Sequence, residues 1–134
     1  MVNEMAKRIL LVDDDADFLD INNTILTAGG YMVDTACTSA EALEKLRSQT
    51  YDLVIIDLIM EELDSGFSIA YAVRDQEQTR NLPILMLTSA QEKTGFNFEF
   101  DKDKQWMKVD DFAAKSLSPA ELLKRVSLLI GKVK

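Results

Sequence analysis

Short apolar runs recur along the chain, and three of them end in an acidic or hydroxyl residue. Residues 8–12 read Arg-Ile-Leu-Leu-Val, residues 51–56 read Tyr-Asp-Leu-Val-Ile-Ile, and residues 82–87 read Leu-Pro-Ile-Leu-Met-Leu. Runs of this length with little polar interruption are typical of strands buried on both faces of a parallel sheet. Two further runs, at 31–36 and 111–114, predict two more strands.

Between these runs, apolar residues recur at helical spacing. Phe18, Ile21, Ile25 and Leu26 predict a first helix, which we expect Gly29-Gly30 to end because glycine tolerates positive φ. Three further helices are predicted. One starts at the capping-box candidate Thr38-Ser39-Ala40-Glu41 and has Leu43 and Leu46 on one face, and a second covers residues 67–78 after a loop. The last starts at the cap Ser118-Pro119-Ala120-Glu121, and its inward-facing residues are Leu122, Val126, Leu129 and Ile130. This alternation predicts an α/β fold, an open parallel sheet covered by helices on both faces.

One segment breaks the alternation. A helix is due between the strand ending at 87 and the strand beginning at 111, but residues 91–110 show little helical period. We therefore expect the fourth helix to be short, displaced or irregular, with an extended or hairpin-like stretch in its place. The aromatic residues of this segment are interpreted as a small local core rather than a partner-binding patch; they are Phe96, Phe98, Phe100 and Trp106.

Composition limits the class of protein. The 134 residues correspond to a single domain, 1–134, with 47% hydrophobic and 28% charged residues. A net charge of -8 disfavours nucleic acid as a partner, because nucleic acid is bound mainly through Lys and Arg. No apolar run approaches the length of a membrane span, and residues 1–7 lack the apolar core of a signal peptide. The single Cys37 is interpreted as a small core residue at a strand end, and we expect a reducing cytoplasm as the location.

The polar residues that follow the three apolar runs are candidates for one site. Asp13 and Asp14 follow the first run, Asp57 follows the second, and Thr88 and Ser89 follow the third. In open parallel sheets, ligands bind beyond the carboxyl ends of the strands, where these side chains would meet. The chain contains no His, which excludes Ser-His-Asp catalysis and His-ligated zinc. Clustered carboxylates without His indicate a hard divalent cation, Mg²⁺ first.

These motifs resemble the receiver domain of two-component response regulators. The matching pieces are Ile9 to Asp15, Asp52 to Met60, Leu82 to Ser89, and Lys115 ahead of Leu117-Ser118-Pro119. The resemblance covers essentially the whole chain and implies a flavodoxin-like doubly wound sheet of five parallel strands in the order 2-1-3-4-5. It implies a stand-alone switch without an output domain.

The resemblance also implies roles for individual residues. Asp57 is similar to the phosphoacceptor, and Asp13 and Asp14 to the acids that hold Mg²⁺ together with Asp57 and the backbone carbonyl of Ile59. Lys115 resembles the ammonium that pairs with the phosphoryl group, and Thr88 the switch hydroxyl. Phe112 stands where the family carries a switch aromatic. By contrast, Asp15 and Ser89 are interpreted as helix caps.

Two departures from the family pattern concern the surroundings of these residues. Glu61 stands where a proline is usual after the phosphoacceptor. Ser116 follows Lys115, where the family usually has a proline in a cis bond. Because a cis peptide without proline costs roughly 2.5–4 kcal/mol, we expect a trans bond, with which Lys115 would be placed differently than in the family. An ordinary snorkelling lysine is the alternative interpretation of Lys115.

The predicted function is a signalling switch that accepts a phosphoryl group from a sensor histidine kinase or a histidine phosphotransfer protein and then acts on a downstream protein. It would assist its own phosphorylation without being a turnover enzyme. An unphosphorylated interaction module that keeps only the fold is the alternative. A Mg²⁺-dependent phosphatase with an aspartate nucleophile would need a second acid two residues after Asp57, and position 59 is Ile.

Overall fold

A computed structural model describes residues 6–57, 65–88, 109–115 and 117–131 of the chain. Five parallel strands form one sheet in the order β2-β1-β3-β4-β5, which confirms the predicted topology. The strands are β1 (Arg8–Val12), β2 (Met32–Ala36), β3 (Leu53–Asp57), β4 (Ile84–Thr88) and β5 (Asp111–Ala114).

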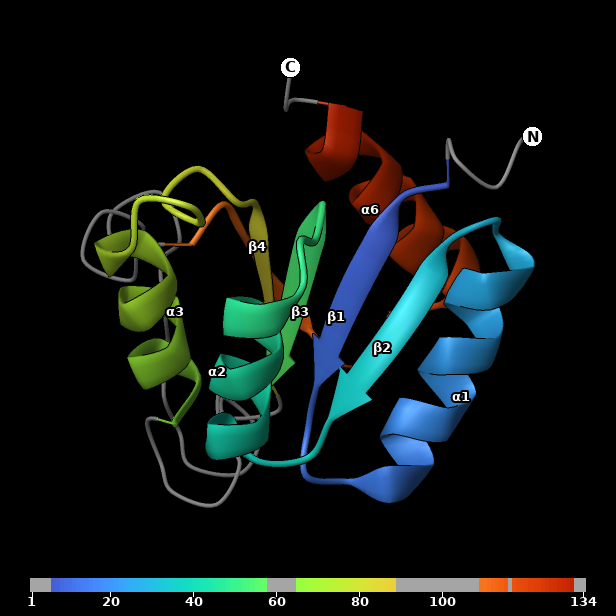
Figure 1. The fold of residues 1–134 in the computed structure, drawn as a ribbon. Coiled ribbons are helices and arrows are strands. Elements are labelled where there is room, and N and C mark those ends of the chain that lie inside the picture. The colour runs from blue at the N-terminus through green and yellow to red at the C-terminus, as the bar shows by residue number, and fades with distance from the viewer. Residues whose placement is uncertain (1–5, 58–64, 89–108, 116, 132–134) are drawn as a thin grey trace.

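Helices cover both faces of the sheet, and all strands point the same way, toward the bottom of Figure 1. In that view α2 and α3 lie on one side of the sheet, and α1 and α6 on the other. Their bounds are α1 (Ala16–Ala28), α2 (Ser39–Ser48), α3 (Ser65–Asp75) and α6 (Pro119–Gly131).

The sheet is buried on both faces because its strands alternate between two cores. In β1, Leu10 and Val12 belong to the core under α2 and α3, whereas Ile9 and Leu11 belong to the core shared with α1 and α6. All four side chains are at most 1% exposed. This double burial is the reason that the apolar runs lack polar alternation.

Side chains cap the helices at the predicted positions. Asp15 caps α1 by accepting hydrogen bonds from the N–H groups of Asp17 and Phe18, as its interpretation as a helix cap required. Thr38 caps α2 by accepting from the Glu41 N–H. The first-helix stop is also confirmed, because α1 ends at Ala28, Gly29 is its C-cap and Gly30 has a φ of 101°.

One expectation about burial was wrong, and one apolar position of α1 faces solvent. Cys37 is exposed rather than part of the core, because β2 ends at Ala36 and the backbone N–H of Cys37 instead donates to the Glu41 carboxylate, 3.0 Å away, at the start of α2. Ile21 shares its helical spacing with Phe18 and Ile25 but is 60% exposed. Within α1 the buried positions are Leu19 and Leu26.

Candidate metal and phosphorylation site

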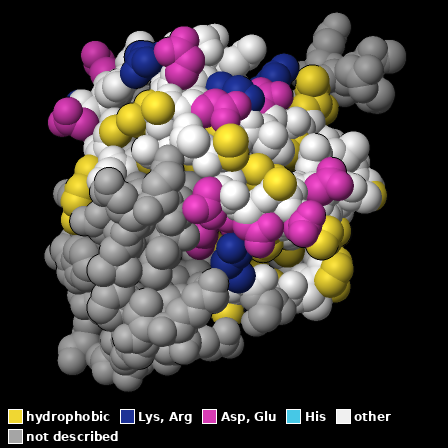
Figure 2. All heavy atoms as spheres, turned by 90° about the horizontal axis from the view of Figure 1, so that it is seen from below, with side chains coloured by type: hydrophobic (Ala, Val, Ile, Leu, Met, Phe, Trp, Pro, Cys, Tyr) yellow, Lys and Arg dark blue, Asp and Glu magenta, His cyan; other side chains and the backbone are white. Residues whose placement is uncertain are grey.

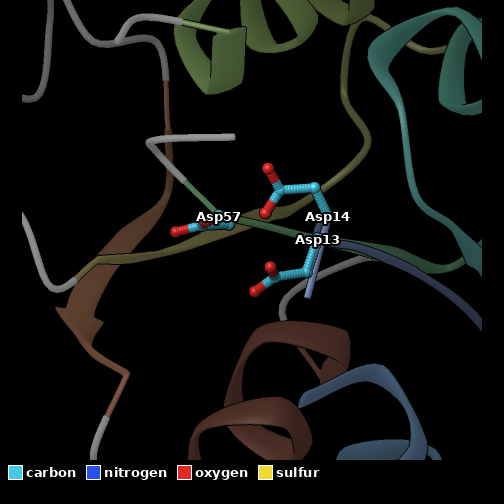
Figure 3. A group of neighbouring side chains, drawn as sticks. All are labelled: Asp13, Asp14 and Asp57. Carbon is cyan, nitrogen blue, oxygen red and sulfur yellow. The ribbon is translucent and has the colours of Figure 1, made fainter. Parts of the chain in front are cut away.

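Three carboxylates meet at the carboxyl edge of the sheet. Asp13 and Asp14 directly follow β1, and Asp57 is the last residue of the adjacent strand β3. One oxygen from each of the three lies within 4.8 Å of the others, and Figure 3 shows the three side chains leaning toward a common space. The parallel pairing of β1 with β3 places these acids side by side, as the sequence predicted.

The three acids differ in their burial. Asp13 is 0% exposed and Asp57 4%, whereas Asp14 is exposed. The site is therefore a group of buried acids with one open flank. Figure 2, which looks onto this edge, shows acidic side chains gathered near the middle of the face with a basic side chain beside them.

Asp13 has an incomplete set of partners for a fully buried carboxylate. Its Oδ1 accepts a hydrogen bond of 2.9 Å from the backbone N–H of Asp15. Its Oδ2 is buried and makes no hydrogen bond of good geometry within the described part of the chain, although the Lys115 ammonium lies 2.8 Å away as an ion pair. Burial raises the pKa of Asp13 despite these contacts, and the charge of Asp14 adds to the rise.

Lys115, in the turn directly after β5, supplies a positive charge to the site. Its Nζ lies 2.8 Å from Asp13 Oδ2 and 3.7 Å from Asp57 Oδ2. Burial alone would lower the pKa of this ammonium, but the contact with Asp13 and the charge of Asp57 outweigh burial and raise it. The alternative of an ordinary snorkelling lysine is disfavoured, because such a lysine holds its ammonium in solvent, whereas this ammonium pairs with two buried carboxylates.

The donor set fits a hard divalent cation. Asp13, Asp14 and Asp57 offer only oxygen ligands, which Mg²⁺ prefers. Two carboxylates at this separation repel by about 3 kcal/mol at an effective dielectric near 20. Among the described residues, the Lys115 ammonium alone pairs with the cluster, and one positive charge does not neutralise three carboxylates. The buried Oδ2 of Asp13, which has the Lys115 ion pair but no hydrogen bond of good geometry among the described residues, points to the same conclusion.

The remaining predicted site residues are described to different extents. Thr88 ends β4 and pairs with Ala114 of β5, but its side chain lies outside the described residues. So do Ile59, Ser89, Glu61 and the peptide bond from Lys115 to Ser116, as well as most of segment 91–110. Phe112 is half-buried and packs against the core under α2 and α3; its role as a switch aromatic stays a prediction.

Sequence reasoning missed one residue of this site. The ring of Phe18 lies under the Lys115 ammonium, with 4.5 Å between Nζ and the ring centroid. Its helical spacing assigned Phe18 only to an apolar face, and nothing in the local sequence marks an aromatic ring that faces a distant lysine.

Comparison with known proteins identifies the family. The model of the response regulator receiver domain matches residues 9–127. The chain belongs to this family. Receivers are signalling domains of two-component systems rather than classical enzymes. Within the described ranges, no helix is both long and apolar enough to cross a membrane.

Individual relatives agree with this assignment. The alkaline phosphatase synthesis transcriptional regulatory protein PhoP of Bacillus subtilis is 35% identical over 129 residues, which cover 96% of this chain and 50% of PhoP. The receiver thus spans about half the length of the curated relatives it matches. Among solved structures, Vibrio cholerae chemotaxis protein CheY4 has a TM-score of 0.80 at 31% identity, with 92% of this chain and 98% of CheY4 covered.

A second solved structure is similar at the level of the whole domain. Response regulator TrrA from Thermotoga maritima, in complex with Mg²⁺-BeF, has a TM-score of 0.76 at 32% identity over 92% of this chain and 98% of its own.

Proposed function

We propose that this receiver is a phosphorylation-dependent switch in which Asp57 accepts a phosphoryl group in the presence of Mg²⁺. The observation that carries the proposal is the meeting of Asp13, Asp14 and Asp57 beside the ammonium of Lys115, the one cation that the described residues bring to the cluster. A structural ion-pair network would match its charges more closely. The complex of the similar TrrA with Mg²⁺-BeF supports the choice of cation.

The chain's own residues would divide the work of the transfer. Asp57, at the end of β3, would attack phosphorus with a carboxylate oxygen, while the bond from phosphorus to the donor nitrogen breaks and its electron pair stays on that nitrogen. Lys115 would hold its ammonium against the phosphoryl oxygens, and Asp13 and Asp14 would hold the cation. Bound Mg²⁺ would offset the charge on the transferring oxygens. Thr88, at the end of β4, is the proposed switch hydroxyl.

Partners and location follow from the same proposal. The phosphoryl donor would be a phosphohistidine on a sensor kinase or a phosphotransfer protein, because the chain contains no His of its own. The signal would pass to a downstream protein through a changed surface, with no direct role for nucleic acid or membrane. We propose a cytoplasmic location, where such kinases present their phosphohistidine.

An intact-mass measurement tests this function. Incubation with Mg²⁺ and acetyl phosphate should add one phosphoryl group to the wild type and none to Asp57→Asn, and EDTA should prevent the addition. Asp52→Asn is the matched control, because Asp52 precedes the same strand but accepts a hydrogen bond from the Arg8 N–H instead of joining the cluster. A full adduct in Asp57→Asn would refute the assignment.

The same measurement distinguishes the proposed switch from the rival function, an unphosphorylated interaction module. An interaction module that keeps only the fold would show no adduct in the wild type. The acids and the ammonium that phosphoryl transfer needs are all present and close together, which disfavours that reading.

A further inference from the structure

The Lys115 ammonium has a neighbour that is not charged. Its Nζ lies 4.5 Å from the centroid of the Phe18 ring, on the side of the site formed by α1. The ring is half-buried and packs against the core shared by α1 and α6. A cation over the face of an aromatic ring at this distance is attracted by the negative charge of that face.

The place of the Phe18 ring is set by the start of α1. Phe18 donates its backbone N–H to the Asp15 carboxylate at 3.3 Å, and the next residue, Leu19, bonds the Asp15 carbonyl. The cap therefore fixes the first turn of the helix directly after Asp13 and Asp14. As a result, the ring and the two acids are held by one short stretch of backbone.

The ammonium needs such a support because it sits at the end of a flexible side chain between unequal partners. Lys115 Nζ lies 2.8 Å from Asp13 but 3.7 Å from Asp57. Without a further contact it could follow Asp13 alone or turn toward solvent and the exposed Asp14. The Phe18 ring blocks one direction in which the ammonium could move, and it adds no charge that would disturb the carboxylates.

We propose that Phe18 is a positioning residue that holds the Lys115 ammonium over the acidic cluster for phosphoryl transfer to Asp57. This inference rests on the proposed function. An apolar packing role for Phe18 is the competing explanation, and leucine would fill that role nearly as well as phenylalanine. The two explanations differ in whether the face of the ring matters.

Phosphorylation rates distinguish these explanations. With Mg²⁺ and acetyl phosphate, the rate constant of Phe18→Leu should fall about three- to tenfold, the range that a part-buried cation–π contact supports, and Phe18→Tyr should restore most of it. Ile25→Val is the matched control, since Ile25 packs from α1 against the same core; its rate should stay within a factor of two of the wild type.

A second variant covers the case in which Phe18→Leu fails to fold. Incorporation of 3,4,5-trifluorophenylalanine at position 18 keeps the shape of the ring and weakens the negative charge on its face. The rate should fall in this protein too. An unchanged rate in the trifluoro protein would overturn the proposal, whether or not Phe18→Leu is slowed, because packing alone would then explain the role of the ring.

A spectroscopic readout makes failure of this inference distinct from failure of the proposed function. In the wild type, ring current should shift the Lys115 Cε protons upfield, and the shift should persist in Phe18→Tyr and vanish in Phe18→Leu. Lys115 Cε protons at ordinary positions in the wild type would overturn the contact, whatever the rates. A wild type that is never phosphorylated would refute the proposed function, and a wild-type rate in Phe18→Leu would refute the role of Phe18 alone.

Discussion

Carboxylates at the two edges of the same sheet have different surroundings. At the amino edge, Asp52 precedes β3 and binds Arg8 of β1 twice, through its N–H to the Arg8 carbonyl at 2.7 Å and through Oδ2 from the Arg8 N–H at 2.9 Å. Asp110 precedes β5 and binds Ile84 of β4 in the same way, at 3.0 and 2.8 Å. Each of these acids completes the hydrogen bonding of a neighbouring strand.

At the carboxyl edge the acids face one another instead. Asp13, Asp14 and Asp57 form one cluster, in which the Lys115 ammonium pairs with Asp13 and Asp57, and Asp13 Oδ2 is left without a well-formed hydrogen bond in the described chain. The comparison teaches that an aspartate beside a strand is structural when backbone donors satisfy it. Where like charges are gathered with too few hydrogen-bond donors, the folded state is less stable, and a functional role is the simplest reason for such a cluster.

The largest expected effect is at the amino edge. Asp110→Ala should lower the free energy of unfolding by about 2 kcal/mol, because it leaves the buried Ile84 N–H and the Arg74 guanidinium, 2.7 Å from the carboxylate, without this acceptor. Urea denaturation would measure the loss. Asp75→Ala, at an exposed position, should change stability by less than about 0.5 kcal/mol; equal losses in the two variants would remove the distinction.

At the carboxyl edge, removal of an acid should have the opposite effect on the free energy of unfolding. Without divalent cation at neutral pH, Asp13→Asn should raise the free energy of unfolding by an amount on the order of 1 kcal/mol, because Asp57 remains to pair with Lys115. Asp20→Asn, exposed on α1, makes the same change of charge and should have little effect. Thermal denaturation in EDTA would decide, and a destabilised Asp13→Asn would show that this carboxylate is satisfied after all.

The pH dependence of that difference follows from the raised pKa of Asp13. A folded pKa above the ordinary value of 3.8 means that the folded state holds the proton more tightly. The associated stability is present below that value and is lost as pH rises through the folded pKa. The advantage of Asp13→Asn should therefore be full at neutral pH and disappear in acid. An advantage that is constant with pH would contradict burial as its cause.

The smallest effect should be at the start of α2. Glu41→Ala should cost about 0.5–1 kcal/mol, since the Glu41 carboxylate accepts the Cys37 N–H. This hydrogen bond lowers the pKa of Glu41, so the contribution is present above the ordinary value of 4.5 and is lost as pH falls through the lowered pKa. Glu44→Ala, which removes a surface pair with Arg47, should be nearly neutral.

Sequence patterns predicted the alternating strands and helices of this molecule. The runs at 8–12 and 111–114 coincide with β1 and β5. For β1 the reason is that a parallel strand buried on both faces has a continuous apolar pattern. The interpretation of Cys37 as a core residue was wrong, and the helical spacing that predicted α1 includes the exposed Ile21. Helical spacing alone gives no direction to the apolar face, and an apolar residue one position beyond a strand has already left the sheet.

The candidate site was predictable in its members but not in its contacts. Consecutive residues Asp13 and Asp14 have the same side chain, yet one is fully buried and the other exposed, a difference that depends on the twist of the chain after β1. Lys115 lies in the turn after β5, and Phe18 lies in α1. The contacts of Lys115 with Asp13 and with the Phe18 ring therefore depend on how these distant segments pack together. Such contacts between distant segments leave no local pattern in the sequence.

The most direct test of the account is whether Mg²⁺ stabilises the fold through the carboxyl-edge acids. At ten times its Kd, a cation bound only by the folded state adds about 1.4 kcal/mol. The wild type should show a melting temperature that rises with millimolar Mg²⁺, Asp14→Asn should show little rise, and Asp52→Asn should show the wild-type rise from its own baseline. A flat wild-type titration, or a full rise in Asp14→Asn, would contradict a cation site at this edge.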